Sequence, residues 1–495
     1  MSHLPHPLYR AAQVRELDRL AIDYYGVHGI ALMNAAGQAL FDELRRSWPE
    51  IQRIAVVCGA GNNAGDGYVA ARLAHQAGIE VELYFLMAGE NLQGDAHRAW
   101  AEAEDAGVSM IVYDGQRIDG HDLIIDALLG TGLDRPVEGL MAEAIEAINS
   151  AGVPVIAADI PSGLSADTGC ALGSAVRADV TVTFIGLKRG LFCADGPDHC
   201  GRLLFDDLHV PHAIYGHQPA SVTRIDYVSL GTGLAPRPRN AHKGDFGHVL
   251  VVGGSQGMAG AVRLAGEAAL RVGAGLVSLA THPAHAHQIA AARPELICHG
   301  VDGPAQLTGL LQQASVVVVG PGLGQEPWGQ ALLACLVESS LPMVLDADAL
   351  NLLAQEPTRS DKWVLTPHPG EAARMLGIST AHLQQDRFAA IHALQEQYGG
   401  VVVLKGCGSL ILDGKGELSL CSDGNPGMSS AGMGDVLSGV IAGLIAQGLC
   451  LEQAARVGVC VHAHAGDLAA REGERGLLAS DLFSHLRRLV NLRTY

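Results

Sequence analysis

Short runs of apolar, mostly β-branched residues alternate along the chain with longer alanine-rich stretches that have a helical period. Buried strands of parallel sheets read as continuous apolar runs, and helices covering both faces of the sheet supply the stretches between them. The pattern therefore predicts the α/β class. The predicted strands are 54–58, 81–85, 123–126, 153–159 and 180–184 in the first half, and 248–252, 275–280, 316–319, 343–346, 363–365 and 401–404 in the second.

A proline-rich stretch separates the two halves. Pro211, Pro219, Pro236 and Pro238 fall between positions 210 and 240, and no long periodic helix can be drawn through them. We therefore expect two domains, residues 1–222 and 223–495, each a three-layer sandwich, the first of them Rossmann-like. The halves do not repeat each other's motifs, so two different activities are expected on one chain.

Composition and charge exclude several classes of function. With 48% hydrophobic and 17% charged residues, the 495-residue chain is a packed globular protein. Its net charge, 33 minus 52 or −19, repels a nucleic-acid backbone, and its apolar runs are far shorter than the roughly 20 residues needed to cross a bilayer. The ten cysteines form no C-x-x-C pair and the first ten residues do not resemble a signal peptide, which predicts a cytoplasmic location.

A glycine-rich turn follows the first predicted strand. The sequence Gly-Ala-Gly-Asn-Asn-Ala-Gly-Asp-Gly occupies positions 59–67, and a helix is expected from about residue 68. Such a turn lets backbone N–H groups approach a phosphate at the positive end of the helix dipole. The spacing departs from G-x-G-x-x-G, so a tight structural turn is the alternative interpretation.

Two further loops follow strands of the same half. Asp126 closes one strand and is followed by Gly130-Thr131-Gly132-Leu133, while Asp-Ile-Pro-Ser-Gly at 159–163 closes the next. The carboxyl ends of strands in a doubly wound sheet line one crevice. We therefore expect these loops to converge with the glycine-rich turn.

Together the three motifs resemble those of the YjeF N-terminal family, the NAD(P)HX epimerases, over roughly residues 10–215. The resemblance implies a potassium ion around Asn63, Asp126 and Ser162, whose oxygen atoms suit a hard cation. It also implies that the dinucleotide is held by Asn62, Asn63, Ala64, Gly65, Asp66, Gly130, Thr131, Gly132, Leu133, Asp134, Arg135 and Pro136.

The same resemblance implies that Asp159 contacts the reacting nucleotide, and it is the candidate for proton handling at the hydrated ring carbon. Lys188, in Gly-Leu-Lys-Arg-Gly, is a candidate for orienting that chemistry, and the alternative is a solvated loop cation. The sequence departs from the family at Asn34, where many relatives carry Glu, and this leaves the role of that helix start open.

The C-terminal half also carries glycine-rich loops after its strands, at 253–261, 320–324 and 366–371. Its most informative segment is Asn-Pro-Gly-Met-Ser-Ser-Ala-Gly-Met-Gly-Asp at 425–435, ahead of an apolar helix. Small residues before a helix start form a nest of N–H donors for phosphoryl charge. Asp435 is placed to take a proton from a hydroxyl that attacks phosphorus, although an Asp at a helix start is often only a cap.

This segment resembles that of the ribokinase-like superfamily, which implies a three-layer α/β/α fold. With Gly-Gly-Ser, Thr-Pro-His-x-Gly-Glu, Lys-Gly-x-x-Ser and Gly-Asn-x-Gly-Met, residues 225–490 are similar to the YjeF C-terminal family, the ADP- or ATP-dependent NAD(P)HX dehydratases. The resemblance implies that Ala261, Gly322, His368 and Asp435 contact the hydrated nucleotide. It implies that Lys405, Gly406, Cys407, Gly408, Ser409 and Gly434 hold the adenine nucleotide.

The two resemblances imply a repair enzyme for hydrated NADH and NADPH, called NADHX and NADPHX. One domain epimerises the R and S forms, and the other dehydrates the S form with ADP, the expected donor because the bifunctional arrangement resembles prokaryotic members. Magnesium is expected to bridge the nucleotide phosphates. The family also implies a homo-oligomer, a tetramer or larger.

Two alternatives come from other classes. A ribokinase-like vitamin or sugar kinase, fused to a nucleotide-binding domain, shares the segment before Asp435 but stops after phosphorylation. Alternatively, the N-terminal half is a non-catalytic binding or scaffold domain in which Asp159 is merely a satisfied buried carboxylate.

Overall fold

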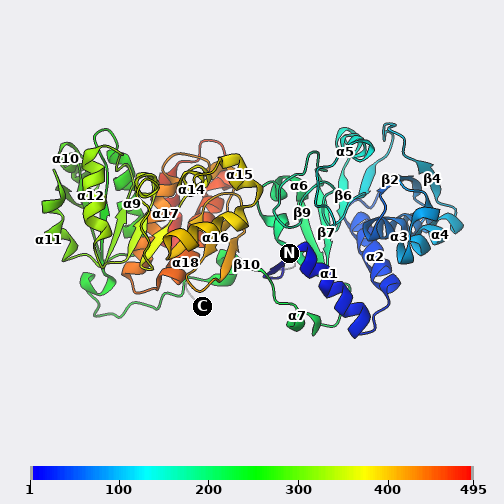
Figure 1. Ribbon diagram of the computed structural model, residues 1–495, viewed down its shortest axis with the longest axis horizontal. Helices are drawn as coiled ribbons and strands as arrows, with labels where there is room; N and C mark the ends of the chain where they lie inside the picture. The colour runs from blue at the N-terminus through cyan, green and yellow to red at the C-terminus, as the bar shows by residue number, and fades with distance from the viewer. Residues whose placement is uncertain (1–3, 492–495) are drawn as a thin grey trace. The chain divides into compact units, whose positions relative to one another are not determined.

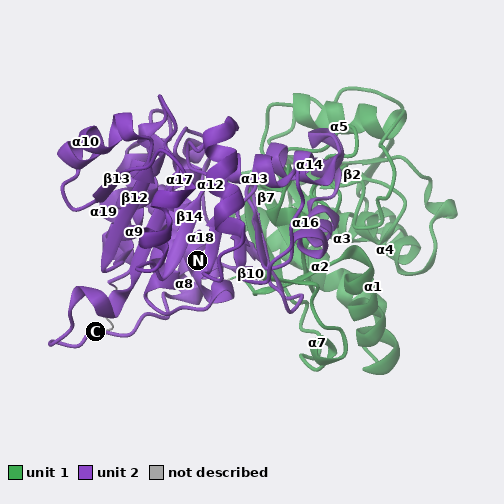
Figure 2. Cartoon of the chain, turned by 60° about the vertical axis from the view of Figure 1, so that its left-hand side comes forward, with its two compact units in different colours: residues 1–223 green, residues 224–495 purple. Residues whose placement is uncertain are grey.

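The computed structural model describes residues 4–491, which divide into two compact units: unit 1 ends at Thr223 and unit 2 begins at Arg224 (Figure 2). Each unit is an α/β sandwich with helices on both sides of its sheet (Figure 1), so the predicted fold class is confirmed. Among the described residues, no helix combines the length and the apolar character that crossing a bilayer requires.

Unit 1 is built on a seven-stranded sheet in which every neighbouring pair is parallel. The strands alternate their side chains between two separate cores, which is why they read as unbroken apolar runs. Ile54 and Val56 pack into one core, and Ala55 and Val57 into the other. In spatial order the strands are β4 Ser109–Val112, β3 Glu80–Phe85, β2 Arg53–Cys58, β5 Leu123–Ala127, β6 Val155–Ala158, β7 Val180–Phe184 and β9 Arg202–Asp206.

Helices cover both faces of this sheet, and three short strands lie outside it. The helices are α1 Ala11–Arg19, α2 Gly29–Ser47, α3 Asn62–Gln76, α4 Gly94–Asp105, α5 Leu140–Ser150, α6 Gly196–Cys200 and α7 Ile214–His217. Strand β1, Pro7–Tyr9, pairs in parallel with β8, Leu187–Lys188, and its residues Pro7 and Leu8 pair with the start of β10, Val222–Ile225.

Unit 2 contains a parallel sheet that ends in an antiparallel hairpin. In spatial order its strands are β13 Ile297–Gly300, β12 Leu276–Thr281, β11 His248–Val252, β14 Val316–Val319, β15 Met343–Leu345, β16 Trp363–Leu365, β17 Val401–Leu404, β18 Ser409–Leu412 and β19 Leu418–Cys421. Its helices are α8 Tyr227–Leu230, α9 Ala259–Val272, α10 Pro283–Ala292, α11 Thr308–Leu311, α12 Pro327–Val337, α13 Ala347–Leu353, α14 Pro369–Leu376, α15 Thr380–Gln385, α16 Arg387–Tyr398, α17 Met433–Ala446, α18 Leu451–Ala469 and α19 Leu482–Leu489.

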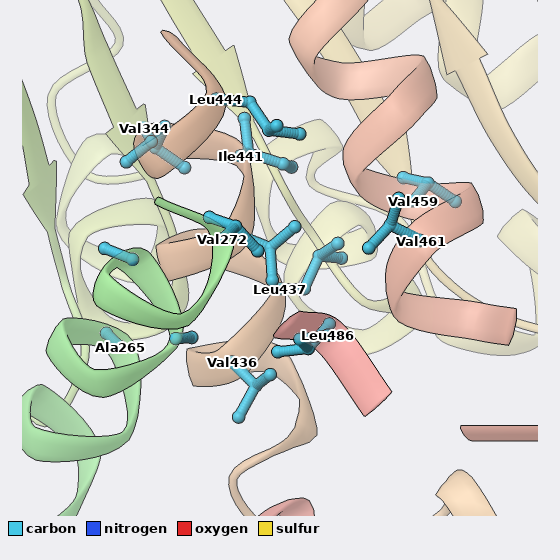
Figure 3. Packing of buried hydrophobic residues seen from close by; sticks show 14 of the residues in the cluster. Ala265, Val272, Val344, Val436, Leu437, Ile441, Leu444, Val459, Val461 and Leu486 are labelled. Carbon is cyan, nitrogen blue, oxygen red and sulfur yellow. The ribbon is translucent and has the colours of Figure 1, made fainter. Parts of the chain in front are cut away.

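The apolar helix α17 is the centre of the unit 2 core. It packs closely against α9, where Gly439 allows the backbone of Ala265 to approach, because a Cβ at Gly439 would lie 2.0 Å from the Ala265 carbonyl oxygen. Figure 3 shows Leu437 and Ile441 of α17 gathered with Val272 of α9, and all three are buried. This packing fixes the start of α17, which carries the predicted nest of N–H donors.

The sequence predicted the central strands but missed β4, β9, β13 and the β18–β19 hairpin. Helix α3 also begins at Asn62, earlier than the expected residue 68, so much of the glycine-rich segment forms the first turns of the helix. Asp159 does not belong to β6. It follows the strand with φ +65°, in the left-handed region that a non-glycine residue rarely adopts.

Candidate active sites

A cavity of about 850 Å³ opens in unit 1 beside the carboxyl ends of β2, β5 and β6. Most of the N-terminal residues singled out in the sequence line it: Asn62, Asn63, Asp66, Gly130, Thr131, Gly132, Leu133, Asp134, Arg135, Pro136 and Asp159. Ala64 and Gly65 are not among the lining residues. Both are buried in α3, and Gly65 faces the Met33 side chain of α2.

Asp159 is fixed at the cavity wall by three donors to one carboxylate oxygen. Its Oδ1 accepts hydrogen bonds from the Lys188 ammonium, the Phe184 N–H at 3.0 Å and the Thr183 hydroxyl at 3.3 Å. Its backbone conformation is strained, and such strain persists only where surrounding structure enforces it. The carboxylate is therefore held in one place, as a group acting on a bound ligand must be.

Lys188 is a buried partner of Asp159, which rejects the interpretation of this residue as a solvated loop cation. Its side chain is 0% exposed and its ammonium also donates to the Thr183 hydroxyl and the Phe184 carbonyl oxygen, both at 3.0 Å. A lysine is buried only when charge partners and acceptors replace its water. This burial was not predictable from the local sequence, because the lysine stands in a glycine-flanked segment next to an arginine.

Two further carboxyl groups line the same cavity, Asp18 of α1 and Asp66 of α3. Burial, with the nearby Asp159 charge, raises the pKa of Asp18 to about 7, although the Lys188 ammonium opposes the rise. Burial and the charge of Asp159 also raise the pKa of Asp66 well above its usual range. The sequence analysis included Asp66 but missed Asp18, which lies outside all three motifs.

Of the three residues expected to hold potassium, Asn63 lines the cavity, whereas Asp126 and Ser162 are not among its lining residues and are hydrogen-bonded to each other. The Ser162 hydroxyl donates to Asp126 Oδ1 at 2.6 Å and its N–H donates to Oδ2 at 2.8 Å, with both residues fully buried. The pKa of Asp126 rises to about 6 because of burial, and the hydrogen bonds from Ser162 limit the rise. Neither polar atom of the buried Asn63 amide finds a hydrogen-bond partner within residues 4–491.

In unit 2, the helix start at Gly432–Asp435 combines a left-handed glycine with a partly buried acid. Gly432 caps α17 at φ +90°, and a Cβ on Gly434 would lie 3.2 Å from the Lys405 ammonium. Burial and the Asp346 charge raise the pKa of Asp435 to about 7, while the Lys405 ammonium opposes the rise. A carboxyl group with this pKa can exchange protons near neutral pH.

The buried Asp346 and the partly buried Lys405 form an ion pair next to this helix start. The Lys405 ammonium lies 2.8 Å from Asp346 Oδ1, and the Ser438 hydroxyl of α17 donates to Oδ2 at 2.6 Å. The Lys405 ammonium holds the pKa of Asp346 below its usual range despite full burial. The next residue, Ala347, has φ +47°, so the strand end at this second site is also strained.

His368 caps α14 beside this pair. Its Nδ1 accepts hydrogen bonds from the N–H groups of Gly370, at 3.0 Å, and Glu371, at 3.3 Å. Because Nδ1 accepts, the neutral ring carries its proton on Nε2. Burial and the nearby Lys405 ammonium lower the pKa of His368, which favours the neutral ring, and its Nε2 lies 3.3 Å from Glu371 Oε1.

The remaining candidates lie on the first turn of α9, which carries Ala261, and on two loops, at 320–324 and 405–409. Ala261 and Gly322 approach each other, because a Cβ on Gly322 would lie 3.2 Å from the Ala261 Cβ. The loop at 405–409 is held from below by the buried Arg387, which donates to the carbonyl oxygens of Lys405 and Cys407. Lys405 itself points to Asp346 rather than outward.

Sequence reasoning missed Asp346, Glu371, Ser438 and Arg387 as parts of this second site. Asp346 ends a predicted strand, so its place at a carboxyl edge was a usable signal. The burial of Arg387 depends on tertiary packing and left no local signal.

These two sites define a class of protein: a ribokinase-like phosphoryl-transfer unit joined to a unit with a dinucleotide-type cavity. Residues 249–488 match the family model described as NAD(P)H-hydrate dehydratase, and residues 29–190 match that of the YjeF-related protein N-terminus. The solved ribokinase-like superfamily protein from Enterococcus faecalis is 29% identical to this chain, with a TM-score of 0.51, covering 55% of this chain and 95% of its own.

Nearly full-length relatives identify the family. The bifunctional NAD(P)H-hydrate repair enzyme Nnr of Coxiella burnetii is 49% identical over 98% of this chain and 99% of its own. The enzyme of the same name from Escherichia coli is 44% identical over 99% and 95%. The chain therefore belongs to the family of bifunctional NAD(P)H-hydrate repair enzymes.

Proposed function

We propose that the chain repairs hydrated NADH and NADPH, with unit 1 epimerising the R and S forms and unit 2 dehydrating the S form with ADP. The observation that carries this proposal is the end-to-end match to relatives named bifunctional NAD(P)H-hydrate repair enzymes. Two separate clusters of carboxyl groups, one around Lys188 and one around Lys405, support it, because each offers proton-transfer chemistry.

In unit 2, Asp435 takes the proton of the ring hydroxyl as its oxygen attacks the terminal phosphorus of ADP. The new O–P bond forms, the phosphoanhydride bond breaks and AMP leaves, while the amides of Gly432–Gly434 stabilise the developing charge. The phosphorylated ring then releases inorganic phosphate and loses a ring proton, which restores the reduced nicotinamide. Phosphorylation is needed because hydroxide is a poor leaving group.

The contacts proposed for this step use the two loops and the helix start. Ala261, Gly322, His368 and Asp435 would contact the hydrated nucleotide, and His368 would donate from Nε2. Gly434 and the loop of Lys405, Gly406, Cys407, Gly408 and Ser409 would hold ADP. Magnesium bound with ADP would supply neutralisation of the phosphate charge, and the carboxylates around Asp435 are oxygen donors of the kind that it prefers.

In unit 1, the dinucleotide would lie in the cavity against Asn62, Asn63, Asp66, Asp159 and the 130–136 loop. Ala64 and Gly65 would shape the helix start without facing the ligand. A potassium ion would be held by Asn63, Asp126 and Ser162. This donor set fits a hard cation by its chemistry, because Asp126 and Ser162, which are hydrogen-bonded to each other, supply oxygen atoms, and the buried Asn63 amide lacks a partner among the described residues.

We further propose a cytoplasmic homo-oligomer, a tetramer or larger. Ten cysteines without a C-x-x-C pair suit a reducing compartment. Sedimentation of the purified chain measures its assembly directly, and a monomer at micromolar concentration contradicts the oligomer.

The test of the proposed function incubates the protein with hydrated NADH and Mg-ADP and follows the absorbance of reduced nicotinamide. Pure S isomer should be converted by unit 2, and pure R isomer should be converted only after epimerisation. Chromatography identifies the products. Free phosphate with recovered NADH supports repair, whereas a stable phosphorylated product supports the kinase alternative that the ribokinase-like fold allows.

A further inference from the structure

The epimerase step needs a group that gives a proton as well as one that takes it. Exchange of the hydroxyl between the two faces of the hydrated ring carbon requires that the leaving oxygen is protonated and the incoming water is deprotonated. Asp159 already accepts three hydrogen bonds on one oxygen, one of them from the Lys188 ammonium. This environment suits the acceptor of a proton better than its donor.

Helix α1 brings a second carboxyl group to the same cavity. Val14, Arg15, Asp18 and Ile22 line the cavity, a set spaced along one side of the helix and its continuation. The helix lies directly on the segment that precedes Lys188, because a Cβ on Gly186 would be 3.3 Å from the side chains of both Val14 and Leu17. Asp18 is thereby placed in the electrostatic field of the Asp159–Lys188 pair.

We propose, on the basis of the proposed epimerase function, that Asp18 is the proton donor of the epimerisation and Asp159 the acceptor. In one direction, the ring nitrogen forms a double bond to the hydrated carbon as the C–O bond breaks, and the hydroxyl leaves as water with the proton of Asp18. Water then adds to the other face, the nitrogen regains its lone pair, and Asp159 takes the proton. Solvent water returns that proton to Asp18, so no oxidant or reductant is needed.

The charges around Asp18 support this division of roles. Burial and the Asp159 charge raise the pKa of Asp18 to about 7, so a protonated fraction is available at neutral pH. When the surroundings of two carboxyl groups in one site favour the protonated form of one and the ionised form of the other, the first can act as an acid and the second as a base. The charged and titratable groups facing the cavity or acting on Asp18 are Arg15, Asp66, Asp95, Asp134, Arg135, Glu138, Asp159, Lys188 and Tyr215.

The test compares Asp18→Asn with Glu16→Gln, a substitution on the same helix whose carboxylate pairs with Arg19 and does not line the cavity. Conversion of R to S isomer is measured without ADP, by chromatography, between pH 6 and pH 8.5. The wild-type rate above background should fall as pH rises through about 7, while Asp18→Asn should lose about 10²-fold or more. Its residual rate should not follow that pH dependence, and Asp18→Glu should recover part of the activity.

The outcomes distinguish a failure of the proposed epimerase function from a failure of the role proposed for Asp18. If the wild-type protein does not speed the conversion, the proposed epimerase function is wrong. If the wild type is active and Asp18→Asn keeps its rate and pH profile, the role of Asp18 is wrong. Dehydration of pure S isomer with ADP reports whether each variant is folded, and loss of that activity in Asp18→Asn but not in Glu16→Gln overturns a specific role in epimerisation.

Discussion

Replacing Asp435 by Asn should remove dehydration and at the same time make unit 2 more stable. The carboxyl group sits where burial and the Asp346 charge disfavour its ionised form, so its pKa rises from 3.8 to about 7. At about 1.4 kcal/mol for each factor of ten, this rise corresponds to about 4 kcal/mol of destabilisation above neutral pH. Asn carries no charge but needs hydrogen-bond partners, so we expect a gain of about 2 to 4 kcal/mol.

Because the pKa of Asp435 is raised on folding, the stability difference between Asp435→Asn and wild type depends on pH in one direction. Below about pH 4 the carboxyl group is protonated in both the folded and unfolded states, and Asn offers no advantage. Between pH 4 and pH 7 the unfolded state releases its proton while the folded state retains it, so the wild type loses stability. The stability gap between Asp435→Asn and wild type should therefore widen from pH 5 to pH 8.

The assay measures the melting temperature of both proteins at pH 5 and pH 8, with Glu338→Gln, on an exposed helix end, as a surface control. Dehydration of the S isomer should fall by about 10² to 10⁴-fold in Asp435→Asn, as expected for loss of a general base. In the wild type the rate should rise about tenfold from pH 6 to the plateau above pH 7. A stability gap that does not change with pH, or an active Asp435→Asn protein, refutes the reasoning.

Three further predictions concern the buried charges. Lys188→Met should abolish epimerisation and destabilise unit 1 by about 3 to 5 kcal/mol, because Asp159 loses its charge partner. The double variant Lys188→Met/Asp159→Asn should regain stability, measured by urea denaturation, but not activity. Lys405→Met should abolish dehydration and destabilise unit 2 by a similar amount, because Asp346 loses its charge partner. R-to-S conversion, measured by chromatography, should stay within twofold of wild type. Replacing potassium by lithium should lower the melting temperature of unit 1 and its epimerisation rate, and identical values in both salts contradict the proposed potassium site.

The central strands of both sheets were predictable because they are buried on both faces. β14 is four valines, and its neighbours in the sheet read as equally unbroken apolar runs. The edge strands β4 and β13 expose part of their side chains and mix polar with apolar residues, so no continuous run marks them. The β18–β19 hairpin was missed although Asp-Gly-Lys-Gly separates its two apolar runs, a usual turn signal.

Some of the candidate site residues were likewise predictable from the local sequence, and others were not. Asp435 could be singled out because it follows a segment of small residues at a helix start, and Asp159 because it stands at a predicted strand end in a motif that resembles that of a known family. The partners that determine their chemistry were not predictable, because Lys188 is 29 residues from Asp159, and Lys405 is 59 residues from Asp346. Such pairs depend on strand order, which the local pattern of a sequence does not specify.

The two units use different folds of the α/β class, yet their sites share one electrostatic arrangement. In each, a lysine that is buried (Lys188) or largely buried (Lys405) pairs with an aspartate at the carboxyl end of a strand, and the backbone at or just after that aspartate is left-handed. In each, a second carboxyl group, Asp18 or Asp435, has a pKa of about 7 because burial and the paired aspartate raise it while the lysine limits the rise. The lysine therefore does more than neutralise its partner. Without it, the second carboxyl group would stay protonated at neutral pH, and a site that must exchange protons would lose its working range.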